Sequence, residues 1–253
     1  MKQGDSAEAI AYAEERVALA RESGDARQTS AALNRLGAAM VYAGDLASAR
    51  GWFEESRDVA RQAGANSAVG RTTVNLGWIA LHDGDLDAAA AQFAEAIEIG
   101  RAADKPLLAV AIGSPGVAFR RSGRVAEAAA DVAEALELAQ KLGLSEELAD
   151  LIREVAAHAT LRGRPKEAAR LIGAEARLRA ELGSIQSQFE QDATAFPLEL
   201  LQATLSDHEL GEEIEAGRAM QLEAAIASAA ALVRPTNEGN STDGIAERSR
   251  PGR

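Results

Sequence analysis

The chain contains no cysteine among its 253 residues. A disulfide framework, a thiolate zinc site and a cysteine nucleophile are therefore all excluded. Aromatic residues make up only 4% of the sequence, whereas 47% of the residues are hydrophobic and many of these are alanine. A core that is poor in large rings and rich in alanine is typical of closely packed helices. The composition thus favours an all-helical chain.

Long apolar runs are also missing. The longest apolar windows, such as residues 224–233, are about half as long as the roughly 20 residues that a membrane-spanning helix needs. The opening residues MKQGDSAEAI lack the apolar core of a secretory signal. We therefore expect no membrane insertion and a cytoplasmic location.

Basic charge is scarce. The formal net charge is −12, and residues 181–233 hold ten acidic residues against a single basic one, Arg218. Such a balance repels phosphate backbones. We expect that this chain does not bind nucleic acid directly and that most of its acidic residues form solvated helix faces.

The motifs of common catalytic sites are absent too. The sequence has no Gly-Lys pair, which excludes a Walker A phosphate loop, and its three histidines lack the His-x-x-x-His spacing of a helical zinc site. We therefore expect no cofactor, no bound metal and no enzymatic activity. An enzyme with an unrecognised site stays open as an alternative, and it rests on the cluster of His82, Asp83 and Asp85 at one turn.

What the sequence does contain is a repeat. Residues 43–53 read AGDLASARGWF, and residues 83–93 read DGDLDAAAAQF. Glycine suits the left-handed residue that ends a helix, and Asp45 and Asp85 can accept hydrogen bonds from the first amides of the next helix. Helix-turn-helix corners are thus expected at intervals of 40, 40, 39 and 40 residues, at Gly4, Gly44, Gly84, Gly123 and Gly163.

Small residues recur in register with these corners. Gly37 and Gly77 precede two of them, and Phe53 and Phe93 follow. A small residue on one helix lets a second helix approach closely, and a large apolar residue then fills the remaining space. Each helix pair is therefore expected to need its neighbours.

The run LNRLGAAMVYAGDLASARGWFEES at residues 33–56 resembles a tetratricopeptide repeat (TPR), a family whose usual period is about 34 residues. The resemblance implies an all-α, right-handed α-solenoid of helix-turn-helix repeats, with longer helices or loops than usual. We expect the repeat array over residues 1–180, an acidic C-terminal helical cap over 181–233 and a disordered tail over 234–253. The matching positions are Leu33, Leu36, Gly37, Met40, Ala49 and Phe53, and then Leu76, Gly77, Ala80, Ala89, Phe93 and Ala96.

The runs at 167–183 and 205–232 resemble the C-terminal helical region of large bacterial signalling ATPases. Those proteins join a LuxR-type or SARP-type DNA-binding domain, or a nucleotide-cyclase domain, to a P-loop ATPase and to TPR-like repeats. The resemblance implies a non-enzymatic interaction or ligand-sensing scaffold, acting as the regulatory module of a bacterial signal-transduction or transcriptional regulator. An ATPase domain, in cis or in trans, would then be the partner. A free-standing TPR adaptor that binds another protein is the alternative.

Two features depart from the repeat pattern. The chain opens on a corner and a second helix with no first helix before them, which predicts either a truncated reading of a longer regulator or a covered face, including a homodimer formed through the first repeat. In the third copy, Pro115 falls inside a helix, where it removes a backbone donor. We expect a kink or break near residues 113–116.

The inner face of the solenoid is the candidate binding surface. In TPR proteins the first helix of each repeat lines a concave groove, and arginine with interleaved Trp and Tyr suits an acidic peptide or a small anionic ligand. The alternative is that Trp78 packs between repeats and the arginines are only solvated. The residues that this pattern selects are Asn34, Tyr42, Arg71, Trp78, His82, Arg120, Arg121 and Arg153.

Overall fold

The computed structural model describes residues 3–113, 125–183 and 196–233. Within these ranges the chain is helical and contains no strand, as the sequence predicts. The predicted kink at Pro115, the corner at Gly123, the groove residues Arg120 and Arg121, and the tail over 234–253 lie outside the described residues.

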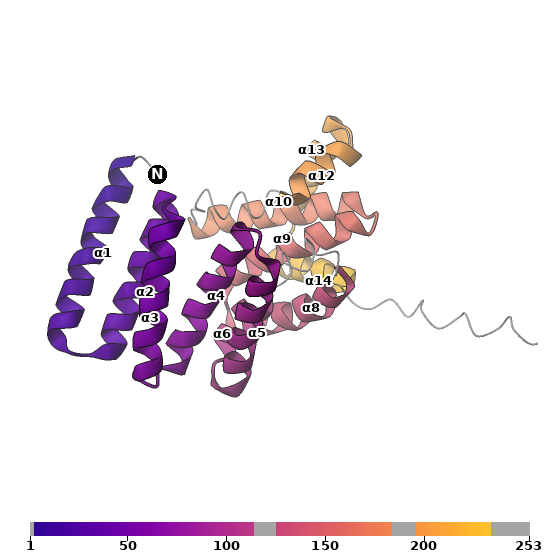
Figure 1. Ribbon diagram of the computed structural model, residues 1–253. Coiled ribbons are helices and arrows are strands. Elements are labelled where there is room, and N and C mark those ends of the chain that lie inside the picture. The colour runs from indigo at the N-terminus through magenta and orange to yellow at the C-terminus, as the bar shows by residue number, and fades with distance from the viewer. Residues whose placement is uncertain (1–2, 114–124, 184–195, 234–253) are drawn as a thin grey trace, which may run out of the picture.

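Consecutive helices pack on one another along the chain and form an all-α solenoid (Figure 1). The first three helices stand upright in this view, and α9 and α10 run across it, so the direction of the helix pairs changes along the array. The bounds are α1 Gln3–Ser23, α2 Ala26–Ala43, α3 Leu46–Gln62, α4 Asn66–His82, α5 Leu86–Ala103, α6 Lys105–Gly113, α8 Val125–Leu142, α9 Ser145–Leu161, α10 Pro165–Leu182, α12 Phe196–Thr204, α13 Asp207–Arg218 and α14 Leu222–Val233.

The predicted corners at Gly44 and Gly84 separate α2 from α3 and α4 from α5. Both glycines have a left-handed backbone, with φ of 83° and 81°, a conformation in which a Cβ is penalised. The Asp45 carboxylate accepts a hydrogen bond from the Ser48 amide, and the Asp85 carboxylate accepts one from the Ala88 amide, each at 3.0 Å. These contacts stabilise the start of each second helix.

The remaining two corners in the described ranges differ from each other. Gly163 also has a positive φ, and Pro165 follows at the first position of α10, where its missing amide hydrogen costs nothing. Gly4 instead lies in the first turn of α1, because that helix begins at Gln3.

A second series of glycines, which the repeat pattern did not predict, ends α1, α3, α8 and α10, whereas the C-cap of α5 is Asp104. These residues also have positive φ and lie about midway between the predicted corners; they are Gly24, Gly64, Gly143 and Gly183. The chain therefore has a turn about every 20 residues, which explains why its full period is 40.

The expected contact between small and large residues forms the seam of each N-terminal repeat. The Phe53 ring of α3 lies against Gly37 of α2, where an added Cβ would be 2.6 Å from the ring. Phe93 of α5 lies against Gly77 of α4 in the same way, at 2.7 Å. Both rings are fully buried, so the seams are packed without space for a larger residue.

The C-terminal helices cover the last repeats. Helix α14 packs against α8, α9 and α10 through an apolar stripe that includes Ile226, Ala229 and Val233. Helices α10 and α13 are in close contact at two glycines: Gly173 of α10 lies against the backbone of Ile214, and Gly217 of α13 lies against the backbone of Arg170, so neither position has space for a side chain. The start of α13 carries a capping box between Ser206 and Glu209.

Candidate functional site

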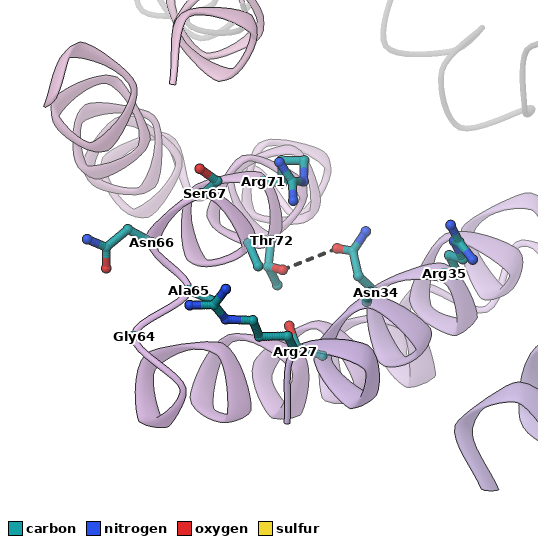
Figure 2. Close-up of a pocket in the computed structure, with 12 residues that line it drawn as sticks. Arg27, Asn34, Arg35, Gly64, Ala65, Asn66, Ser67, Arg71 and Thr72 are labelled. Carbon is teal, nitrogen blue, oxygen red and sulfur yellow. Dashed lines mark hydrogen bonds between the residues drawn. The ribbon is translucent and has the colours of Figure 1, made fainter. Parts of the chain in front are cut away.

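A hollow of about 500 Å³ lies between α2 and α4 (Figure 2). Helix α2 contributes Arg27, Asn34 and Arg35, and α4 contributes Arg71 and the residues around its N-terminus. Figure 2 shows these side chains on the facing surfaces of the two helices. The hollow is large enough for a few side chains of an extended peptide.

Helical spacing explains why these residues share one surface. Arg27, Asn34 and Arg35 are seven and eight residues apart on α2, which places them on one face two turns long. The Asp25 carboxylate sets the start of that helix by accepting hydrogen bonds from the amides of Arg27 and Gln28.

A chain of polar side chains connects the two walls beneath the hollow. Asn34 Oδ1 accepts a hydrogen bond from Nδ2 of the Asn75 side chain at 3.0 Å and one from the Thr72 hydroxyl at 3.2 Å. The Thr72 hydroxyl lies 3.3 Å from that of Ser56 on α3, and Ser56 donates to the Ser30 carbonyl on α2 at 2.8 Å. The network fixes the oxygen of Asn34 toward α4 and leaves its amide nitrogen on the side away from Thr72 (Figure 2).

The charge of the hollow is positive. Among the described residues, the exposed guanidinium groups of Arg27 and Arg35 form no ion pair. The Arg71 guanidinium lies 3.6 Å from the Asp104 carboxylate, which precedes α6. Three arginines thus line a hollow whose own lining has no acidic residue, and the carboxylates nearest to them are Asp104 beside Arg71 and Asp25 beside Arg27.

Asp104 is held in its ionised form. Burial by itself would raise its pKa, but hydrogen bonds from the Leu107 amide and the Ser67 side chain, together with the charge of Arg71, lower the pKa below its usual value. The Leu107 bond is 2.9 Å long and caps the start of α6. Asp104 therefore caps α6 and links it to Arg71 of α4.

The structure brings two of the predicted groove residues, Asn34 and Arg71, together in this hollow. Tyr42 is exposed near the end of α2, and His82 is exposed at the end of α4 with its Nδ1 3.4 Å from the Asp83 carboxylate. Neither of them lines the hollow.

Trp78 and Arg153 have packing partners instead. Trp78 meets Phe93 edge to face, with the ring centroids 6.0 Å apart, in a contact between the two helices of one repeat. Arg153 donates a hydrogen bond to the buried Glu175 carboxylate of α10. It is largely buried in an ion pair that joins α9 to α10.

Sequence reasoning missed Arg27 and Arg35. Both could have been found by extending the predicted face of Asn34 along α2, because Arg35 is its neighbour and Arg27 lies two turns earlier. The start of α4 was missed for another reason: its contribution to the hollow depends on how α4 packs beside α2, which no local pattern encodes.

The described part of the chain contains neither a metal-binding cluster of side chains nor a membrane-spanning helix. There, no group of three or more His, Asp and Glu side chains is placed to hold a metal ion. No helix in the same ranges is both long and apolar enough to cross a membrane.

Comparison with known proteins identifies the N-terminal repeats. The tetratricopeptide repeat model matches residues 1–62 and 28–102, which contain both walls of the hollow. No curated protein matches the chain. The match shows that the N-terminal helix pairs are tetratricopeptide repeats, a repeat type that commonly binds proteins or peptides, and the described residues as a whole form an all-α solenoid.

Proposed function

We propose that this protein is an interaction scaffold whose hollow between α2 and α4 binds an acidic segment of a partner protein. The observation that carries the proposal is the group of three arginines around one hollow, two of which, Arg27 and Arg35, form no ion pair among the described residues. Guanidinium groups form charge-assisted, bidentate hydrogen bonds with carboxylates. The half-buried Asn34 amide adds a neutral donor between them.

The overall charge makes this proposal specific to the hollow. A chain with a net charge of −12 repels acidic peptides at long range. Binding of such a peptide must therefore come from a local cluster of positive charge. The arginines around the hollow provide that cluster.

Reversing a charge in the hollow should weaken binding of an acidic probe. With fluorescein-labelled octaglutamate at low salt, we expect the Arg27→Glu and Arg71→Glu variants each to bind about tenfold more weakly than the wild-type chain, because each loses an attraction of roughly 1.4 kcal/mol. Fluorescence anisotropy measures the dissociation constant, and circular dichroism checks that helicity is retained.

The control is Lys141→Glu, which makes the same change in charge on the exposed surface of α8. It should bind octaglutamate within about twofold of the wild type. Position 141 does not line the hollow, and salt screens the interaction between exposed charges that are more than about 10 Å apart. Equal binding of octaserine and octaglutamate by the wild type would contradict the proposal. So would a loss in Lys141→Glu as large as that in Arg71→Glu.

Two settings use this hollow differently. In a bacterial signalling regulator, supported by the resemblance of the runs at 167–183 and 205–232, the acidic segment would belong to an ATPase domain, and its binding would regulate ATP turnover. In a free-standing adaptor, the segment would belong to a separate partner. Because both settings use the same hollow, the Arg71→Glu variant should weaken binding of the acidic segment in either one.

ATP turnover by a P-loop ATPase domain of the resembling class distinguishes the two settings. Under the regulator hypothesis, adding the wild-type chain should change the turnover rate in a saturable manner, and the Arg71→Glu chain should not. Turnover that stays the same at saturating concentrations of the chain would contradict the regulator hypothesis and favour the adaptor.

A further inference from the structure

A second hollow, of about 310 Å³, lies directly beside the first, between α1 and α2. Both hollows are lined by Ala31 and Arg35 of α2. These two residues are one turn apart on the same face. They form the ridge that a bound chain would cross in passing from one hollow to the other.

The second hollow has a different chemical character. Its lining includes the buried methyl groups of Ala20 and Ala32 and the side chain of Leu19, which is 48% exposed. Arg16 on α1 and Arg35 on α2 lie at its edges. An apolar floor between two guanidinium groups suits an aliphatic side chain that is flanked by acidic residues.

The repeat shows that Leu19 occupies a position built for apolar contact. Forty residues later, its counterpart Val59 on α3 is only partly exposed and packs against the core formed by α1 and α2. Leu19 is one of the most exposed large hydrophobic residues of the described chain. The α1–α2 hollow therefore offers apolar surface that the described part of the chain leaves uncovered.

We propose that the α1–α2 hollow binds an aliphatic side chain of the same acidic segment, an inference that rests on the function proposed above. The segment would place its acidic residues against Arg35 and Arg71 and its aliphatic residue against Leu19, Ala20 and Ala32. Crossing a helix about 10–12 Å wide takes about three or four extended residues at roughly 3.3–3.6 Å each. The recognised pattern is thus acidic residues with an aliphatic residue about three or four positions away from the main acidic contact.

A leucine scan of the acidic probe tests this pattern. In labelled octaglutamate, each position is replaced in turn by leucine or, as a matched control for the lost charge, by serine. With the wild-type chain, we expect leucine to bind about five- to tenfold more tightly than serine at one or two neighbouring positions only, because partial burial of a leucine contributes roughly 1–1.4 kcal/mol. Nonspecific apolar attraction would instead give a similar gain at every position.

Variants of α1 locate the effect. Leu19→Ser should abolish the position-specific gain from leucine and leave binding of octaglutamate itself within about twofold of the wild type. Tyr12→Ser is the control, because Tyr12 is 65% exposed on the same helix and does not line the hollow; it should keep the full gain. The inference would be overturned if leucine gave the same affinity as serine at every position, or if the gain from leucine persisted in Leu19→Ser. In either case, octaglutamate binding that depends on Arg71 would still support the proposed function. Absence of octaglutamate binding would instead contradict the proposed function.

Discussion

Replacing Glu175 by leucine should lower the free energy of unfolding by about 3–5 kcal/mol, because the change leaves buried positive charge without its partner. Glu175 is 3% exposed on α10 and accepts hydrogen bonds from Arg153 of α9 and from Arg179 one turn further along α10. Both guanidinium groups are themselves largely buried. Urea unfolding followed by circular dichroism measures the loss.

The carboxylates around Arg179 favour the charged form of its guanidinium group. Burial would lower the pKa of Arg179, but the nearby carboxylates of Asp150 and Glu175 raise it above the usual value. The guanidinium of Arg179 also donates a hydrogen bond to Asp150 at 2.5 Å. Losing Glu175 therefore cannot be relieved by deprotonating the arginine.

A triple variant separates the cost of unpaired charge from the cost of lost packing. In Arg153→Met, Glu175→Leu, Arg179→Met, no charge of the trio remains, so we expect most of the stability lost in Glu175→Leu to return. If the triple variant is no more stable than Glu175→Leu, the loss comes from packing, and the ion-pair account is wrong. A loss below about 1 kcal/mol in the single variant would also contradict it, because burial of an uncompensated charge costs more than that.

Replacing Phe53 by alanine should cost about 3–5 kcal/mol of stability, as expected for removal of a fully buried aromatic side chain. The Phe53 ring is 1% exposed and fills the space above Gly37. Gly37→Leu should also destabilise the chain, by about 1–3 kcal/mol, since its side chain enters the space of the ring. Urea unfolding of the two single variants gives both values.

The double variant tests whether the two residues act as one packing unit. In Gly37→Leu, Phe53→Ala, the leucine can enter the vacated space, so we expect the double variant to lose at least about 1 kcal/mol less than the sum of the two single losses. Simple addition of the losses would show that the residues do not share a packing site.

Gly51→Leu is the matched control for the glycine substitution. Gly51 lies on α3 near Phe53, and an added Cβ there would meet nothing within 4 Å. We expect a gain of about 0.5–1 kcal/mol, because glycine in a helix interior costs that much relative to better helix formers. A loss there as large as that in Gly37→Leu would mean that crowding by Phe53 is not the cause.

Much of the fold could be predicted because its signals are local. The turns at Gly44 and Gly84 and the caps at Asp45 and Asp85 are complete within a few residues, and they recur at a constant spacing. The contacts of Phe53 and Phe93 with glycine follow the same register. Periodicity therefore predicted the helices, their pairing and the seams between them.

The candidate site was predicted only in part. Asn34 and Arg71, two of the residues predicted for the groove, line one hollow although they come from different repeats. Arg153 carries the same side chain as Arg71 on an equivalent helix, yet Arg153 is largely buried against Glu175, whereas Arg71 is mostly exposed beside Asp104. Whether an arginine faces solvent or a carboxylate depends on residues more than twenty positions away.

The amino-acid sequence was sufficient to specify helices, turns and a repeating solenoid, because capping, turn geometry and apolar spacing act over one or two helical turns. Packing between helices placed α4 beside α2, completed the arginine-lined hollow and opened a second hollow beside α1. The same packing directed Arg153 inward and left Arg27 and Arg35 exposed. These outcomes depend on the angle and register at which distant helices meet, and only the assembled array determines them.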